Sequence, residues 1–129
     1  MTNTHKTVIA GSRSITDYEV VCEAIDSAPF NISTVVSGKA VGVDTLGEKW
    51  AENNGLPIEE YPFEDYKDEN DPRPAPLIRN QAMATNSDAL IAVWDGSSSG
   101  TENMITEAKK NDLRIHVFRV DTSSLTDFI

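Results

Sequence analysis

The sequence is short of the residues that build covalent cross-links and metal sites. It has one cysteine, Cys22, and two histidines, His5 and His116, among 129 residues. A single cysteine excludes an internal disulfide and a zinc site built on a cysteine cluster, and two histidines far apart do not suggest a metal site. We therefore expect no metal and no cofactor, and we interpret Cys22 as a buried thiol within a helix rather than a reactive one.

Long apolar segments are also absent. No run approaches the roughly 20 residues that a membrane-spanning helix needs. Residues 1–11, MTNTHKTVIAG, lack the longer apolar segment and the cleavage signal of a secretory peptide. We therefore expect a cytoplasmic protein without membrane contact.

Positive charge is scarce, with 11 lysines and arginines against 21 aspartates and glutamates and a formal net charge of −10. Proteins that bind a nucleic-acid backbone use basic side chains to neutralise its phosphates. The charge balance therefore disfavours general nucleic-acid binding. A small anionic ligand stays compatible with it, because the backbone N–H groups at a helix N-terminus bind an anion locally.

Short apolar segments typical of strands alternate along the chain with segments whose apolar residues have helical spacing. This alternation predicts an α/β fold with a mainly parallel, five-stranded sheet and helices on both of its faces. The length fits one domain, residues 1–129, in which residues 1–5 and 121–129 are tails. The expected strands are residues 6–11, 33–38, 56–62, 88–96 and 114–120, and the expected helices are residues 16–28, 42–55, 77–87 and 100–113.

Local features distinguish some of these elements. Residues 88–96 are apolar on both faces and predict the most central strand, whereas the glutamates and flanking prolines of residues 56–62 predict an edge strand. Thr16 or Ser14 is available to cap the first helix. The acidic, proline-rich residues 63–76 predict a long loop of the kind that often lies over a site.

Three of the expected strands lead into polar loops that contain glycine, at residues 10–14, 37–44 and 94–101. The carboxyl ends of parallel strands lie at one edge of a sheet, where ligands of α/β proteins bind at the switch point in strand order. We therefore expect the three loops to converge on a cleft lined by free backbone N–H groups and hydroxyls.

The loop at residues 94–101 has the strongest signal for an anion. Gly96 and Gly100 allow close backbone approach and positive φ, and the helix that starts at Gly100 and Thr101 presents unpaired N–H groups and a positive dipole end. Such a loop suits a phosphate or a carboxylate; the alternative is a flexible connector with a serine or threonine as helix cap. Its hydroxyl donors are Ser97, Ser98, Ser99 and Thr101.

Charged residues near the loops have two interpretations each. Arg13 grips a phosphate or is solvated, and Arg79, beside Asn80, contacts a ligand or lies on a helix surface. Lys39 is a site residue or a surface lysine, and Asp44 is a site residue or a helix cap. For both arginines we favour a role in ligand affinity through charge, with little contribution to the fold.

Other residues have the same ambiguity. Trp94 packs in the core or stacks on a base, and Asp95 bonds a ribose or forms a turn. Glu102 and Glu107 are acid–base residues or exposed helical glutamates. Neither a Walker A sequence nor a complete G-x-G-x-x-G pattern is present, which disfavours a P-loop NTPase and a dinucleotide-dependent oxidoreductase.

The chain resembles the YspA/YpsA-related branch of the SLOG superfamily, whose members include the LOG phosphoribohydrolases. The resemblance spans residues 6–120, and its motifs occur in the family's order. It implies a Rossmann-like, doubly wound fold and a nucleotide or nucleotide-derived ligand, which in several relatives is bound by a sensor. The segments that carry the resemblance are TVIAGSRSITD (7–17), VVSGKAVGVDTLGEKWAENNGLPIEEYP (35–62) and PLIRNQAMATNSDALIAVWDGSSSGTENMITEAK (76–109).

The resemblance also assigns ligand contacts. It implies a first ligand loop, a second ligand loop, an arginine–asparagine pair and a phosphate loop. The second loop is SGKAVGVD, with Ser37 and Lys39, in place of the more usual GGARGAD. Together with the loop residues above, the expected ligand site comprises Gly11, Ser12, Arg13, Gly38, Lys39, Gly42, Asp44, Arg79, Asn80, Asp95, Gly96, Ser97, Ser98, Ser99, Gly100 and Thr101.

One position departs from the LOG enzymes. Where the resemblance places their catalytic glutamate, this chain has Asn103, which is unable to act as a general base. Glu102 is adjacent but points about 100° away around a helix. The sequence therefore predicts a binding module, as a sensor or sequestering protein, for a nucleotide-like small molecule. The alternatives are an N-glycosidic hydrolase that uses Glu102 or Asp44, and a nucleic-acid-processing accessory protein, which the acidic balance disfavours.

Assembly is the last expectation. The resemblance suggests a homodimer or a larger homo-oligomer. A short chain with two tryptophans is also able to expose an apolar helix face to a second copy.

Overall fold

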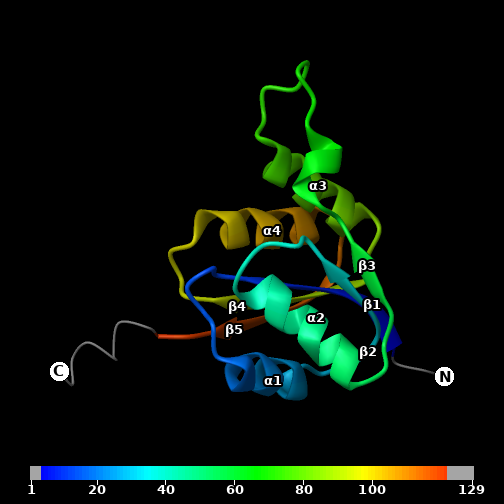
Figure 1. The fold of residues 1–129 in the computed structure, drawn as a ribbon, viewed down its shortest axis with the longest axis vertical. Helices are drawn as coiled ribbons and strands as arrows, with labels where there is room; N and C mark the ends of the chain where they lie inside the picture. Colours follow the sequence, from blue (N-terminus) through cyan, green and yellow to red (C-terminus); the bar gives the residue numbers. More distant parts are fainter. Residues whose placement is uncertain (1–3, 122–129) are drawn as a thin grey trace.

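The computed structural model describes residues 4–121, which form a five-stranded sheet with helices on both faces (Figure 1). Every pair of neighbouring strands is parallel. The expected α/β, Rossmann-like, doubly wound fold is therefore confirmed. The strands are β1 (Thr4–Gly11), β2 (Asn31–Ser37), β3 (Ile58–Glu60), β4 (Ala89–Trp94) and β5 (Arg114–Arg119). The helices are α1 (Tyr18–Ser27), α2 (Val43–Asn53), the 3-10 helix η1 (Phe63–Tyr66), α3 (Ala75–Thr85) and α4 (Ser99–Lys110).

The strand order is β3-β2-β1-β4-β5, with β1 at the centre. From β1 the chain moves outward through β2 to β3, and then forms β4 and β5 on the other side of β1. The predicted edge position of residues 56–62 is confirmed by β3. The prediction that residues 88–96 form the most central strand is wrong, because β4 lies next to β1. Both strands are buried on both faces, so apolar character alone does not distinguish them.

Two pairs of helices cover the two faces of the sheet. Helices α1 and α2 pack on one face, and α3 and α4 pack on the other (Figure 1). Successive strand residues point to opposite faces. In β1, Ile9 therefore joins the core under α1 and α2, while Val8 joins the core under α3 and α4. The chain after β1 turns to one face and the chain after β4 turns to the other, which makes the β1/β4 boundary the switch point of the sheet.

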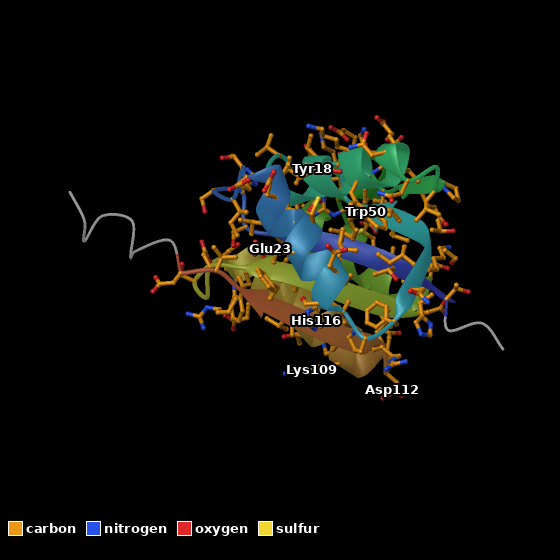
Figure 2. All side chains as sticks on the ribbon, turned by 90° about the horizontal axis from the view of Figure 1, so that it is seen from below. Tyr18, Glu23, Trp50, Lys109, Asp112 and His116 are labelled. Atoms are coloured by element: carbon orange, nitrogen blue, oxygen red, sulfur yellow. The ribbon has the colours of Figure 1, made fainter. Side chains whose placement is uncertain are left out.

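Helix α1 lies across its face of the sheet, as Figure 2 shows. At its C-terminal end Ser27 Oγ lies 2.8 Å from His116 Nε2 of β5. Cys22 is partly exposed on this helix, because the position before it, Val21, points into the core. The prediction that Cys22 is buried is therefore wrong, because its side chain is partly exposed.

The start of α1 also differs from the prediction. Asp17 is the capping residue, and its Oδ1 accepts a hydrogen bond from Glu19 N at 3.0 Å. Thr16 and Ser14 therefore do not cap this helix. An aspartate immediately before the first helical residue is among the best caps, because its short carboxylate reaches the free N–H groups of the first turn.

Residues 63–76, predicted as one long loop, include helical residues at both ends. They begin with η1, which packs near α3, and the following segment projects beyond α3, away from the sheet (Figure 1). Helix α3 starts at Ala75, so Pro76 stands in its first turn, where proline is well tolerated.

Two further predictions concern the ends and the surface of the chain. β1 begins at Thr4, so residues 4 and 5 belong to a strand, while the predicted tail residues 1–3 and 122–129 lie outside the described residues. Within residues 4–121 the exposed large apolar side chains are Val41, Phe63 and Val117. Helices α1 to α4 therefore show no apolar face of the expected kind in this range, and homo-oligomerisation stays a prediction. No helix in the same range is long and apolar enough to cross a membrane.

Candidate functional site

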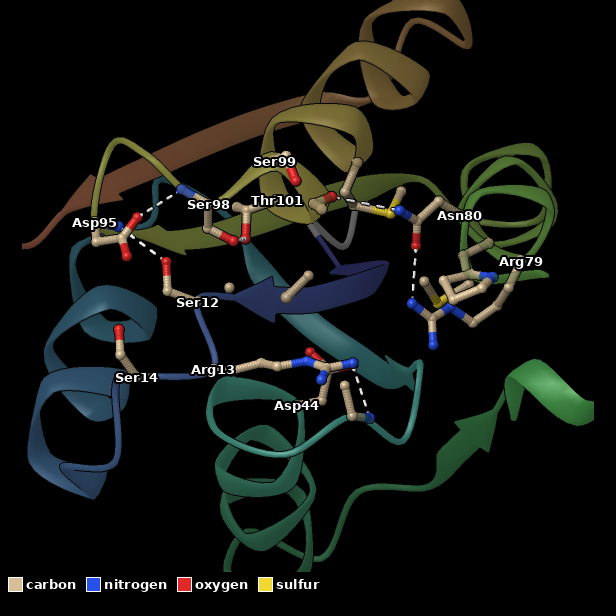
Figure 3. Close-up of a pocket in the computed structure, with 17 residues that line it drawn as sticks. Ser12, Arg13, Ser14, Asp44, Arg79, Asn80, Asp95, Ser98, Ser99 and Thr101 are labelled. Atoms are coloured by element: carbon tan, nitrogen blue, oxygen red, sulfur yellow. Dashed lines mark hydrogen bonds between the residues drawn. The ribbon is translucent and has the colours of Figure 1, made fainter. Parts of the chain in front are cut away.

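A cavity of about 530 Å³ lies where β1 and β4 end, at the switch point of the sheet (Figure 3). The loop after β1 and the loop after β4 form two of its walls, and the loop before α2 and the first turns of α3 complete it. This is the position at which open parallel sheets bind their ligands. The volume falls within the range of about 300–1,000 Å³ that is usual for small-molecule sites.

The structure brings most, but not all, of the predicted site residues to this cavity. Those that line it are Gly11, Ser12, Arg13, Asp44, Arg79, Asn80, Asp95, Ser98, Ser99, Gly100 and Thr101. Predicted residues that do not line it are Gly38, Lys39, Gly42, Gly96, Ser97 and Glu102. Residues that line it without having been assigned to the site are Ala10, Ser14, Ala40, Pro76, Met83 and Met104. The sequence did not indicate a site role for the two methionines, because an apolar residue at helical spacing is typical of the hydrophobic core.

Asp95 organises the loop between β4 and α4. Its Oδ1 accepts hydrogen bonds from Ser97 N and Ser98 N, each at 2.9 Å, and its own N–H donates to Ser12 Oγ at 3.1 Å. The two N–H donors hold the pKa of the Asp95 carboxyl below its usual range. Gly96 allows this turn with φ of 87°. Of the two interpretations of Asp95, the turn is the one that the contacts support.

The N-terminus of α4 opens into the cavity without a side-chain cap. Ser98 precedes the helix and makes no side-chain cap hydrogen bond; its Oγ instead lies 3.2 Å from Thr101 Oγ1. The first N–H groups of any α-helix have no partner within the helix. At Gly100 an added Cβ would meet no atom within 4 Å, and the residue does not have the positive φ that the sequence suggested. Gly100 therefore borders open space in the cavity.

Arg79 is buried on the opposite wall, on α3. Arg79 is only 9% exposed, and its Nη1 donates a hydrogen bond to Gly38 O at 2.8 Å. Nη2 donates to Asn80 Oδ1 at 3.3 Å, while the buried Nε has no hydrogen-bond partner. Burial lowers the pKa of the guanidinium, and nearby Asp44 opposes that change. Arg79 is therefore no surface arginine, and the expectation that it contributes little to the fold is wrong.

Asn80 connects α3 to α4. Its Nδ2 donates to Asn103 Oδ1 at 3.0 Å and approaches Gly100 O at 3.4 Å. The side-chain amide of Asn80 thus binds the first turns of α4, although the residue also lines the cavity. Asn103, which stands where the resemblance places the LOG glutamate, is part of this structural contact.

Arg13 enters the cavity from the loop after β1. The residue is exposed, and Figure 3 shows its side chain extending across the cavity towards α3. Gly42, with φ of 82°, lets the second loop pack against the first, because a Cβ there would lie 2.7 Å from Arg13 O. Gly42 therefore positions the two loops from behind the cavity.

Lys39 does not line the cavity. Its Nζ lies 2.7 Å from Glu60 Oε2 and 3.4 Å from Glu48 Oε1. These carboxylates raise the pKa of the ammonium, Glu60 contributing most. Of its two interpretations, the surface lysine is the one that the contacts support.

Asp44 is a buried acid at the cavity wall. It is 5% exposed, and its Oδ2 accepts a hydrogen bond from Ala40 N at 3.3 Å. Burial raises the pKa of its carboxyl to about 6, although the Ala40 N–H and the Arg79 charge both oppose the rise. Helix α2 has Gly42 before it and no side-chain cap, so Asp44 is not the cap of this helix.

The shifted pKa of Asp44 predicts a pH-dependent stability. The folded chain holds the Asp44 proton more tightly than the unfolded chain, so this group stabilises the fold at low pH and the contribution is lost as the pH rises from about 4 to about 6. We expect Asp44→Asn to remove this pH-dependent loss of stability, because asparagine does not ionise. Its free energy of unfolding relative to wild type should increase by about 2–3 kcal/mol between about pH 4 and pH 7. Urea unfolding of both proteins across this range is the measurement, and parallel pH profiles would contradict the prediction.

Part of the chain is similar to a known protein family. The YspA, cpYpsA-related SLOG family matches residues 5–65, from β1 to η1, including the first two loops of the site. Over these residues, slightly less than half of the chain, the sequence is similar to that family. The match ends before α3, so Arg79, Asn80 and the start of α4 lie beyond it.

A curated protein similar to part of this chain is known from Bacillus subtilis (strain 168). It is the uncharacterized SPbeta prophage-derived protein YoqJ, with 45% identity over 42 residues, which are 33% of this chain and 25% of that protein. The alignment therefore spans a quarter of the relative's length. No solved structure matches the chain significantly.

The acidic side chains of α4 do not reach the cavity. Glu102 is exposed and absent from the lining, and Glu107 is buried further along the helix, 3.5 Å from Lys110 Nζ. Asp44 is therefore the better placed of the two predicted catalytic carboxylates. Among residues 4–121 no group of three or more histidine, cysteine, aspartate or glutamate side chains is arranged to hold a metal ion.

Proposed function

We propose that the cavity binds a nucleotide or a nucleotide-derived small molecule, with its phosphate at the N-terminus of α4. The observation that carries the proposal is the uncapped start of this helix, which opens into a cavity that Arg13 and Arg79 also line. Unpaired N–H groups, the positive end of the helix dipole and two guanidinium groups all favour an anion. The role that follows is that of a sensor or a sequestering module.

Two features make a nucleotide more suitable than a bare phosphate. The cavity of about 530 Å³ is much larger than a phosphate group, so most of a bound molecule must be something else. The similarity of residues 5–65 to a SLOG family also supports a nucleotide-related ligand. The chain's charge of −10 does not oppose this, because the local donors act at contact distance while remote surface charges are screened by salt.

The ligand is best identified by mass spectrometry of small molecules released from the natively purified protein. We expect an intact phosphate-bearing nucleotide or nucleotide derivative at near-stoichiometric yield. A Gly100→Asp variant purified in parallel is the control for specific capture and should release none. Release of no phosphate-bearing molecule by the wild-type protein, combined with no binding of nucleoside monophosphates by calorimetry, would contradict the proposal.

One observation favours a second candidate, hydrolysis of the N-glycosidic bond of a nucleoside monophosphate. Asp44 lines the cavity with its pKa raised to about 6 by burial, so a fraction of it is protonated near neutral pH and able to donate a proton to a leaving base. Incubation with nucleoside monophosphates distinguishes the two functions. Free base and ribose 5-phosphate that appear with wild type and not with Asp44→Asn would support hydrolysis, whereas unchanged nucleotide supports binding alone.

A further inference from the structure

A second cavity, of about 290 Å³, adjoins the first. The two share Arg13, Ala40, Pro76 and Arg79 as lining residues. The two cavities are therefore neighbours, and the shared residues form part of the wall of each. The second cavity is bounded on its other side by the loop before α2 and by η1.

The second cavity has an apolar wall that folding covers only in part, with Lys67 Nζ 5.5 Å from the centroid of the Phe63 ring. Val41 is 63% exposed and Phe63 is 40% exposed, and both line it. Within residues 4–121 the remaining exposed large apolar side chain is Val117, on the edge strand β5. Single exposed apolar side chains are ordinary on protein surfaces, but two that border one cavity form a local apolar surface.

The exposure of Val41 is built into the loop that carries it. Ala40 N donates to Asp44 Oδ2 at 3.3 Å, and Ala40 O accepts from Thr45 Oγ1 at 3.0 Å. One residue earlier, Lys39 has a positive φ of 63°, and its N–H donates a hydrogen bond to Ser37 Oγ at 3.1 Å. The backbone before Val41 is thus held, so the valine does not turn inward to bury itself.

Three basic residues line the second cavity, and two of them, both arginines, also line the first. The third is Lys39, but its Nζ is paired with Glu60 and Glu48. Arg13 and Arg79 line both cavities, and the flat guanidinium of an arginine stacks well on an aromatic ring while its edge donates to an anion. The complementary ligand is therefore a planar, uncharged ring with an anionic group attached to it.

We propose that the second cavity holds the base of the nucleotide whose phosphate lies at the N-terminus of α4, with the ring against Phe63 and Val41 and the ribose beside Arg13. This proposal rests on the proposed function and adds to it a subsite and its chemistry. It makes Phe63 and Val41 determinants of affinity for the base rather than for the phosphate.

The test compares ligands with and without a base. The dissociation constants of the 5′-monophosphates of adenosine, guanosine, cytidine and uridine, and of ribose 5-phosphate, are measured by calorimetry on wild type, Phe63→Ala and Val41→Ser. We expect wild type to bind at least one nucleotide more tightly than ribose 5-phosphate, and Phe63→Ala to weaken that nucleotide about ten- to hundredfold, the usual loss when one base–aromatic stack is removed. Ribose 5-phosphate should bind wild type and Phe63→Ala equally. Val117→Ser removes another exposed valine, 41% exposed on β5, and is the control for Val41→Ser, so it should change neither affinity.

Each outcome decides a different point. If Phe63→Ala and Val41→Ser leave the ratio of nucleotide to ribose 5-phosphate affinity unchanged while Gly100→Asp abolishes both, the base subsite is wrong and the phosphate site stands. If wild type binds none of the five probes, this inference is overturned, and the proposed function is overturned with it if the purified protein also releases no phosphate-bearing molecule. Phe63→Leu, which keeps an apolar side chain without an aromatic ring, should keep the thermal transition of wild type and lose most of the preference for the nucleotide.

Discussion

Replacing Gly100 with aspartate should abolish nucleotide binding and leave the fold intact. An added Cβ at Gly100 meets no atom within 4 Å, so the larger side chain fits. A carboxylate in the first turn of α4 also interacts favourably with the helix dipole, by about 0.3–1 kcal/mol. The same charge occupies the place proposed for the ligand phosphate and repels it. We expect a loss of affinity of more than about a hundredfold, which is about 2.7 kcal/mol of binding free energy, with an unchanged or slightly raised thermal transition.

Gly100→Asn separates charge from bulk, because asparagine has the size of aspartate without its charge. It should retain most of the affinity and have a thermal transition close to that of Gly100→Asp. Equal losses in both variants would mean that the side chain blocks the cavity by size. Undiminished binding by Gly100→Asp would remove the phosphate from the N-terminus of α4 altogether. Titration calorimetry and thermal unfolding on the same samples give both quantities.

The two arginines of the cavity should separate affinity from stability. A hydrogen bond to a charged group contributes about 1.5–3 kcal/mol, so Arg13→Ala and Arg79→Ala should each weaken nucleotide binding about 10- to 150-fold. Arg13 is exposed, and its loss should leave the free energy of unfolding within about 0.5 kcal/mol of wild type. Arg79 is buried, bonds Gly38 O and lies near the buried Asp44, so its loss should also cost about 1.5–3 kcal/mol of stability.

Lys109→Ala is the control for the loss of one positive charge at a distance. Lys109 is exposed in the last turn of α4, at the opposite end of the helix from the cavity, so its removal should leave the affinity unchanged. Arg13→Ala with the affinity of Lys109→Ala would show that Arg13 is merely solvated. Arg79→Ala with wild-type stability in urea unfolding would contradict the structural role inferred from its contacts.

The sequence by itself determined the fold class and the location of the cavity. Apolar runs such as residues 89–93 alternate with amphipathic segments, and such runs become buried strands because only a sheet with helices on both faces covers them. Parallel strands end at one edge, so the loops that follow β1 and β4 had to meet there. Their small, polar residues made this edge recognisable without any tertiary information.

The role of each loop residue was decided by the tertiary structure. Lys39 and Arg79 are both basic residues of the site predicted from the sequence. Lys39 is nevertheless paired with carboxylates of α2 and β3, while Arg79 is buried against Gly38, 41 residues away. Local sequence does not record which partner a long side chain finds.

The electrostatics of Asp44 have the same origin. A carboxyl in the first turn of a helix reads as a solvated cap, but the surrounding α3 and the loop before α2 exclude water from it and raise its pKa to about 6. Desolvation depends on everything that packs around a group, most of which is distant in the chain. The sequence therefore determined which loops reach the cavity edge, and only the packing of distant segments decided which of their side chains line the cavity and which are paired or buried.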